Sequence, residues 1–185
     1  TLHRLQQFFS YPVDCLFVAA MNPCPCGYFP DRNRCHCTPG QIRAYQRGIS
    51  KPILERMDLC VSLPSITLQD ALTKEKGISS AVLRKQVEKA RKMQERRFFQ
   101  EEKIRWNGDM NVRAVNEYCE LGKEEAEYME NIFKLKNLSM RTYHKLLKLA
   151  RTIADLEEEE KINMNHLAEA VSYRSLEEVL FSFEG

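Results

Sequence analysis

The sequence predicts an α/β segment with two buried strands and a cysteine-rich loop, followed by an all-helical bundle. Two observations support this fold class. The apolar runs 15–21 and 59–63 each end at a turn that contains proline, which is typical of short strands buried on both faces of a parallel sheet. From residue 81 to residue 185 the chain contains no proline, and apolar residues recur at helical spacing.

Short elements make up the first 80 residues. Asn22-Pro23 ends the first strand, because proline lacks an N–H and biases the residue before it to an extended backbone. An edge segment or hairpin with a turn at Tyr11-Pro12 is expected before that strand. The expected ranges are 1–14 for the edge segment, 22–40 for the cysteine loop, 41–47 and 53–57 for two short helices, and 65–80 for a polar linker. The predicted domains are therefore residues 1–64 and 81–185, with the linker between them.

Capping residues and apolar stripes define the helices of the second domain. Ser139 is expected to cap the helix with the clearest stripe, Asn165 a shorter one, and Ser175 with Glu178 forms a capping box for the last. The main stripes are Leu83, Val87, Ala90 and Met93; Val112, Val115, Tyr118 and Cys119; Ala126, Met129, Ile132 and Phe133; and Tyr143, Leu146, Leu147, Ala150, Ile153 and Ala154.

The composition is that of a soluble globular protein, with 43% hydrophobic and 29% charged residues among 185. A net charge of +2 is too close to zero to indicate nucleic acid by itself. We expect no membrane span, since no apolar run approaches about 20 residues. We also expect a cytoplasmic location, because the first ten residues lack the apolar core of a signal peptide. The absence of an initial methionine suggests a piece of a longer protein.

Two C-x-C pairs lie in the loop, at Cys24 and Cys26 and at Cys35 and Cys37. Zinc takes four tetrahedral ligands, and paired thiolates on tight turns supply them. The spacing predicts a structural Zn²⁺ site with all four positions filled by protein, although His36 could replace one cysteine. The alternative is a loop of free or oxidised cysteines. Cysteines 15, 60 and 119 lie in apolar stretches and are expected to be small buried hydrophobic residues.

Several runs carry a family resemblance: Val18-Ala19-Ala20-Met21-Asn22-Pro23-Cys24-Pro25-Cys26-Gly27, Cys35-His36-Cys37, Ile49 to Leu59 with Leu54-Glu55-Arg56-Met57-Asp58, and Leu138-Ser139-Met140-Arg141-Thr142-Tyr143-His144. Together they resemble the magnesium-chelatase-like AAA+ ATPases of the ComM/YifB type. The resemblance implies the carboxyl-terminal part of an AAA+ nucleotide-binding core, followed by a helical lid. It implies ATP with Mg²⁺ as the cofactor of the full-length protein, a hexameric ring, and DNA as a partner in branch migration during natural transformation.

The resemblance also implies roles for three residues. Asn22 matches sensor 1, where a neutral amide at a strand end contacts the γ-phosphate or orients the attacking water. Arg56 matches the arginine finger that reaches the ATP of a neighbouring subunit. Arg141, two residues after the Ser139 cap, matches sensor 2 in a first helical turn that already favours anions. Walker A and Walker B motifs are absent from these 185 residues, so the chain alone is expected to hydrolyse no ATP.

Other interpretations remain open. An ATPase subunit of a magnesium-chelatase-type complex would share every residue seen here, and a zinc-stapled helical interaction module would need none of the ATPase roles. Residues 84–97 carry seven basic and two acidic side chains, a net charge of +5. This basic helix could follow a phosphate backbone, but a solvated helix face or an inter-subunit surface explains it equally simply.

Overall fold

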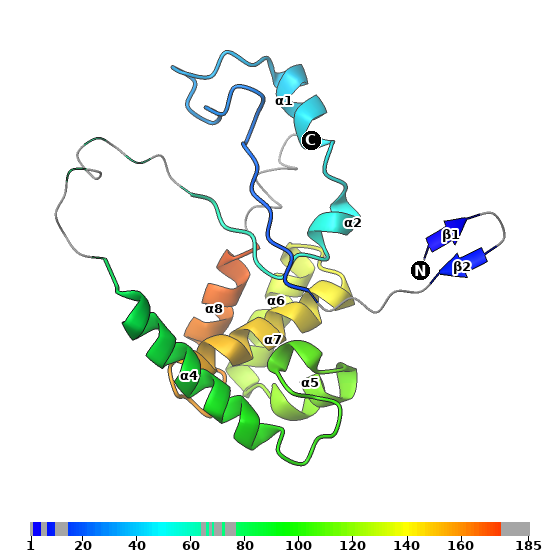
Figure 1. Cartoon of the computed structure of the whole chain (residues 1–185), viewed down its shortest axis with the longest axis vertical. Helices are drawn as coiled ribbons and strands as arrows, with labels where there is room; N and C mark the ends of the chain where they lie inside the picture. The colour runs from blue at the N-terminus through cyan, green and yellow to red at the C-terminus, as the bar shows by residue number, and fades with distance from the viewer. Residues whose placement is uncertain are drawn as a thin grey trace. The chain divides into compact units, whose positions relative to one another are not determined.

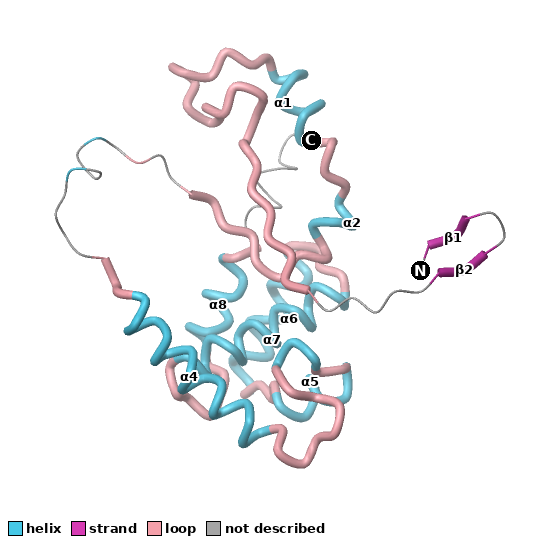
Figure 2. Tube along the Cα trace, in the orientation of Figure 1, coloured by secondary structure: helices cyan, strands magenta, loops and turns pink. Residues whose placement is uncertain are grey.

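The computed structural model describes residues 2–4, 7–9, 15–63, 66, 68, 72 and 77–174. The chain divides into two compact units, Thr1–Gly48 and Ile49–Gly185. Figure 1 shows the elements along the chain, and Figure 2 shows how much of the first unit is loop and how helical the second unit is.

A hairpin opens the first unit. Strand β1 (Leu2–Arg4) pairs antiparallel with strand β2 (Gln7–Phe9), with Leu2 opposite Phe9. The expected hairpin is confirmed, and the turn predicted at Tyr11-Pro12 lies outside the described residues. Helix α1 (Pro39–Gln46) begins at a capping box, because the Thr38 hydroxyl accepts from the Gln41 N–H and the Gln41 side chain accepts from the Thr38 N–H.

The two predicted buried strands are wrong. Residues 15–21 and 59–63 have no strand assignment, and in the first run Leu16 is 90% and Val18 79% exposed. In the second run Leu63 is 85% exposed. Apolar character indicates what a strand could bury, but a strand forms only where neighbouring strands accept and donate its backbone hydrogen bonds. The described residues supply no such neighbours to either run.

Helices form the second unit in its described part, as predicted for the region after residue 81. They are α2 (Lys51–Leu54), α4 (Ser80–Arg97), the 3-10 turn η1 (Asn107–Asp109), α5 (Val112–Tyr118), α6 (Lys123–Leu135), α7 (Met140–Leu156) and α8 (Met164–Ser172). Helix α7 packs against α4, α5, α8 and η1, and α6 packs against α8. Figure 1 shows α7 in the middle of this bundle.

The core of the bundle lies around α7. Leu146, Leu147 and Ala150 of α7 pack with Leu167 and Ala170 of α8, and all five are buried. Met129 of α6 and Val115 of α5 are fully buried in the same cluster. Three of the four predicted stripes therefore face a common core. The stripe on α4 is covered only toward its carboxyl end, where Ala90 is buried, whereas Leu83 and Val87 are 47% and 46% exposed.

A buried polar network joins α4, η1 and α7. The carboxylate of Asp155 is fully buried and accepts from Arg97 through both terminal nitrogens, from the Asn107 Nδ2 at 2.8 Å and from the Arg151 Nε at 3.2 Å. Arg151 also donates to the carbonyls of Glu159 and Glu160, which closes the carboxyl end of α7. Two cations therefore share one buried carboxylate, and the backbone satisfies the rest of Arg151.

Helix starts agree with the capping prediction at one position and differ at another. The Ser139 hydroxyl accepts from the Thr142 N–H at 3.2 Å, so Ser139 caps α7 as expected. Helix α8 is capped by Asn163 and not by Asn165, because the Asn163 Oδ1 accepts from the N–H groups of Asn165 and His166. Ser175 and Glu178 lie outside the described residues.

Candidate functional site

Four cysteine thiols converge in the loop of the first unit. The Sγ atoms of Cys24, Cys26, Cys35 and Cys37 all lie within 4.8 Å of one another. The separations are 3.4 Å from Cys24 to Cys26, 3.8 Å from Cys24 to Cys35 and 3.6 Å from Cys26 to Cys35. A tetrahedron with zinc–sulfur bonds of about 2.3 Å has sulfur–sulfur edges of about 3.8 Å, so this donor set fits one Zn²⁺.

Tight turns hold the two cysteine pairs together. The Gly27 N–H donates to the Cys24 carbonyl at 3.0 Å. Gly27 has a φ of +83°, a backbone conformation that is strained for any residue with a side chain. The Phe29 N–H then points at the Cys24 Sγ at 3.4 Å. On the other side, Asp31 accepts from the backbone N–H of Cys35 at 2.8 Å through its own carbonyl. Local backbone geometry, rather than a hydrophobic core, therefore brings distant thiols into contact.

The electrostatics of the cluster favour thiolates at the first pair. Burial raises the pKa of Cys24, but the N–H of Phe29 and other donors outweigh it and lower the pKa overall. The Tyr28 N–H is the main cause that lowers the pKa of Cys26 to about 6. A hydrogen bond from the Cys26 backbone lowers the pKa of Cys37. Burial and the neighbouring thiolates outweigh that hydrogen bond and raise the pKa of Cys37 to about 11. Crowded thiolates repel one another, and a divalent cation would relieve that repulsion.

Of the alternatives for this loop, disulfide bonds and ligation by His36 lose support. All seven cysteines are free, and the 3.4 Å between Cys24 and Cys26 is far beyond a disulfide bond of about 2.05 Å. His36 is exposed and does not belong to the group of converging ligands. Among the other cysteines, Cys60 and Cys119 are buried as expected, whereas Cys15 is exposed because the strand predicted to contain it does not form.

Asn22 lies beside the cysteine loop. Its side chain is exposed, and its carboxamide lies about 3.7 Å from the place where a side chain on Gly27 would begin. A side chain at Gly27 would strain the backbone, whereas its first carbon would only be in ordinary van der Waals contact with Asn22. The amide thus sits against a turn that the cysteines Cys24 and Cys26 enclose.

Arg56 follows the short helix α2 in the second unit. The side chain is exposed, and its Nη1 donates to the Pro52 carbonyl at 2.7 Å, at the start of the same helix. Leu54 is buried and anchors the segment. The helix expected over 53–57 is observed as α2 followed by a turn at residues 55 and 56, so Arg56 lies just beyond the helix.

Arg141 occupies the first turn of α7, and its side chain is exposed. Within the described residues it has no hydrogen-bond or ion-pair partner. Free N–H groups and the dipole at the start of a 17-residue helix favour anions there. The guanidinium is therefore available to an anionic ligand.

Sequence patterns missed the contacts between the Arg56 segment and the helical bundle. The Lys145 Nζ of α7 lies 2.7 Å from Asp58 Oδ1 and also donates to the Arg56 carbonyl. The Arg174 Nη1 donates to the Met57 carbonyl at 2.5 Å. Lys145 and Arg56 are 89 residues apart in sequence, and Arg174 and Met57 are 117 apart. A lysine in a helix of ordinary amphipathic pattern gives no signal of such a contact.

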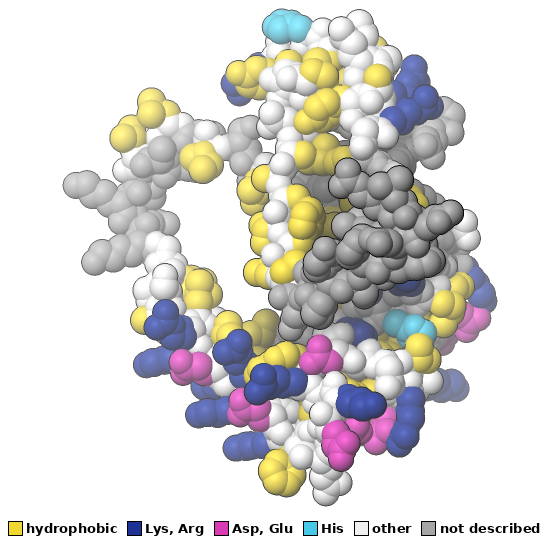
Figure 3. Space-filling model, turned by 45° about the vertical axis from the view of Figure 1, so that its right-hand side comes forward, with side chains coloured by type: hydrophobic (Ala, Val, Ile, Leu, Met, Phe, Trp, Pro, Cys, Tyr) yellow, Lys and Arg dark blue, Asp and Glu magenta, His cyan; other side chains and the backbone are white. Residues whose placement is uncertain are grey.

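Several cationic side chains of the basic helix α4 contact partners within the second unit. Arg97 pairs with Asp155, Lys89 lies 2.5 Å from Glu158, and the Arg91 guanidinium lies over the Trp106 ring at 5.1 Å. Figure 3 shows Lys and Arg side chains along this helix at the lower left, with acidic side chains between them. These contacts favour a solvated structural face over a phosphate-tracking surface.

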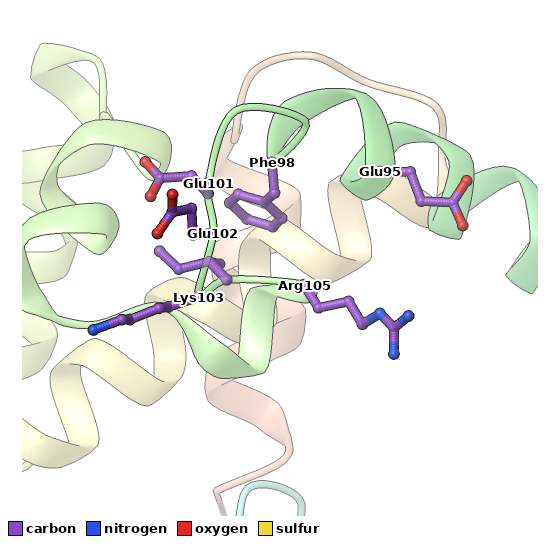
Figure 4. Close-up of a pocket in the computed structure, with 7 residues that line it drawn as sticks. Glu95, Phe98, Glu101, Glu102, Lys103 and Arg105 are labelled. Atoms are coloured by element: carbon purple, nitrogen blue, oxygen red, sulfur yellow. The ribbon is translucent and has the colours of Figure 1, made fainter.

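A pocket of about 450 Å³ opens beside the end of α4. Figure 4 shows Phe98 at its centre and the charged side chains of Glu95, Lys103 and Arg105 directed away from that ring. None of the cysteines, Asn22, Arg56 or Arg141 lines this pocket. The arrangement brings together no group of side chains with an evident chemical role.

Family models match both parts of the chain. Residues 1–71 match the model described as magnesium chelatase, subunit ChlI, and residues 77–174 match the model of its carboxyl-terminal region. The chain belongs to the magnesium-chelatase-like family, and residues 77–174 match the carboxyl-terminal region of that family.

Curated relatives place the chain near two named proteins of that family. It is 37% identical to YifB of Salmonella typhimurium over 99% of this chain and 35% of the relative, and 36% identical to YifB of Escherichia coli over 99% and 35%. It is 34% identical to the competence protein ComM of Haemophilus influenzae over 97% of this chain and 34% of the relative. The chain thus spans about a third of the length of these relatives. No described helix is long and apolar enough to cross a membrane.

Proposed function

We propose that this chain is the sensor and lid portion of an ATP-hydrolysing AAA+ protein of the ComM type. The observation that carries the proposal is the exposed Arg141 in the first turn of α7, behind the Ser139 cap, in a chain of the magnesium-chelatase-like family. An arginine added to the anion-favouring end of a helix suits the phosphates of a nucleotide.

Three residues would act on ATP and its Mg²⁺. Asn22 would accept or donate a hydrogen bond at the γ-phosphate or the attacking water without adding charge. Arg56 would reach the nucleotide of a neighbouring subunit, where its guanidinium stabilises the charge that develops on the transferred phosphoryl group. Arg141 would bind phosphate from the lid. The exposure of all three side chains supports these roles.

The cysteine cluster would hold one structural Zn²⁺. The sulfur separations of 3.4 to 3.8 Å among Cys24, Cys26 and Cys35, with the Cys37 Sγ within 4.8 Å of these three, support tetrahedral ligation by the four cysteines. Four protein ligands leave no open position for a substrate, so the metal would stabilise the loop instead of catalysing a reaction. Since Asn22 lies against the same loop, the metal would also fix the position of the proposed sensor.

The domain boundaries and partners belong to the same proposal. Residues 1–64 would be the end of a nucleotide-binding core and 81–185 a helical lid, joined by the linker 65–80. The full-length protein would assemble as a hexameric cytoplasmic ring and act on DNA, which the likeness to a competence protein supports. A second candidate, an ATPase subunit of a metal-inserting chelatase, is supported by the family description.

The test is the variant Arg56→Ala in the full-length protein. We expect it to bind ATP with an unchanged Kd and to lose at least about 10³-fold in turnover, because a finger acts on the transition state. Arg113→Ala is the matched control, since the Arg113 side chain is 88% exposed on α5. Normal turnover by Arg56→Ala would refute the proposal. Stimulation of turnover by branched DNA or by a porphyrin would separate the two candidates.

A further inference from the structure

The segment that carries Arg56 is fastened to the helical bundle by polar contacts. Lys145 of α7 binds the Arg56 carbonyl and the Asp58 carboxylate, and Arg174 donates to the Met57 carbonyl. The Cys60 N–H donates to the Tyr173 carbonyl at 2.9 Å. Three consecutive residues, 56 to 58, therefore each have an oxygen held by a cation of the bundle.

Lys145 is the contact that acts on Arg56 itself. Its side chain is 20% exposed, and its ammonium binds a main-chain oxygen of the proposed finger residue and the carboxylate two residues later. Asp58 is 78% exposed, and ion pairs with one partner in water add little to stability. The contact therefore determines where the segment lies more than whether the bundle folds.

The same face of α7 carries Arg141. Residues four apart on a helix lie one above the other, so Arg141 and Lys145 project from one side of α7. One residue of this pair is free to contact an anion, and the other holds the Arg56 backbone. A movement of α7 that follows ligand binding at Arg141 would move the anchor of Arg56 with it.

We propose that Lys145 is a positioning residue that ties Arg56 to helix α7, so that the guanidinium of Arg56 is oriented by the helix that carries Arg141. This inference rests on the proposed function of Arg56. Lys145 touches no reacting atom; it acts through the Arg56 carbonyl and the Asp58 carboxylate.

The experiment measures ATP binding and turnover of full-length variants. Lys145→Met keeps the length of the side chain and removes its charge, and we expect turnover to fall about 10-fold to 100-fold with the Kd for ATP within about twofold. Lys145→Arg is expected to restore most of the turnover, because a guanidinium can bind both oxygens. Lys134→Met, at an exposed lysine of α6, is the matched control.

A second pair of variants separates positioning from a folding defect. Asp58→Asn removes the same ion pair from an exposed position, and we expect a smaller loss of turnover with an unchanged Tm. In the Arg56→Ala background, Lys145→Met is expected to cause no further loss, since both changes act through one side chain. Turnover of Lys145→Met within about twofold of the unmodified protein, or additive losses in the double variant, would overturn the inference. If Arg56→Ala itself keeps its turnover, the proposed function fails instead.

Discussion

Asp155 offers a sharp test of what holds α7 in place. The Asp155 carboxylate is fully buried and accepts hydrogen bonds from Arg97, Asn107 and Arg151. Replacing Asp155 by alanine would leave two cations without their shared counter-charge, and side chains of Arg97 and Arg151 are only 13% and 3% exposed. Removing one member of a buried ion pair costs about 3 to 5 kcal/mol. The whole unfolding free energy of a domain is about 5 to 15 kcal/mol, so the loss is a large part of it.

Urea unfolding measures this loss directly. Trp106 is the single tryptophan of the chain, and its ring packs beside Arg91 near the network, so its fluorescence reports on the second unit. With a urea slope of about 2 kcal/mol per molar, the unfolding midpoint of Asp155→Ala is expected to fall by about 2 M. Glu130→Gln is the matched control, because that carboxylate pairs with Lys134 in water, and we expect almost no change. A midpoint for Asp155→Ala as close to the unmodified protein as that of Glu130→Gln would refute the reasoning.

Two further predictions concern cysteine chemistry. Elemental analysis of the purified protein is expected to find one zinc per chain, lost in Cys24→Ser with Cys26→Ser but kept in Cys15→Ser, whose thiol is exposed and outside the cluster; protein that binds no zinc would contradict the metal site. Burial raises the pKa of the Cys119 thiol from its ordinary value of 9.0 to about 11. Because the folded state disfavours the thiolate, the stability that Cys119 contributes is fully present below pH 9. As the pH rises through 11, the free energy of unfolding is expected to fall by about 2 to 3 kcal/mol. The measurement is the unfolding free energy of the unmodified protein and of Cys119→Ala at each pH. If the unfolding free energy falls equally in both proteins as the pH rises, the prediction is contradicted.

Local signals predicted much of the second unit. The Ser139 cap and the apolar stripe that follows it determine α7, since capping and helical periodicity depend on residues within a few turns of one another. The exposed amino-terminal half of the α4 stripe shows the limit of that reasoning. Helical periodicity indicates which face of a helix is apolar but not whether another element covers that face.

The apolar runs 15–21 and 59–63 show the same limit more strongly. Their residues suit buried strands, yet both runs have no strand assignment and are largely exposed in the structure. Whether an apolar run becomes a strand depends on hydrogen-bonding neighbours, and the composition of the run carries no information about them.

By itself, the sequence determined the cysteine spacing, the principal helices and the family to which the chain belongs. Each of these depends on residues that are close together along the chain or on short sequence motifs. Only the tertiary structure decided that four thiols meet within 4.8 Å, that Asp155 is shared by two cations, and that Lys145 holds the backbone of Arg56. The Arg97–Asp155 and Lys145–Arg56 contacts join residues that are 58 and 89 positions apart in sequence. Their partners are chosen by how the turns and helices pack, which no local pattern of side chains specifies.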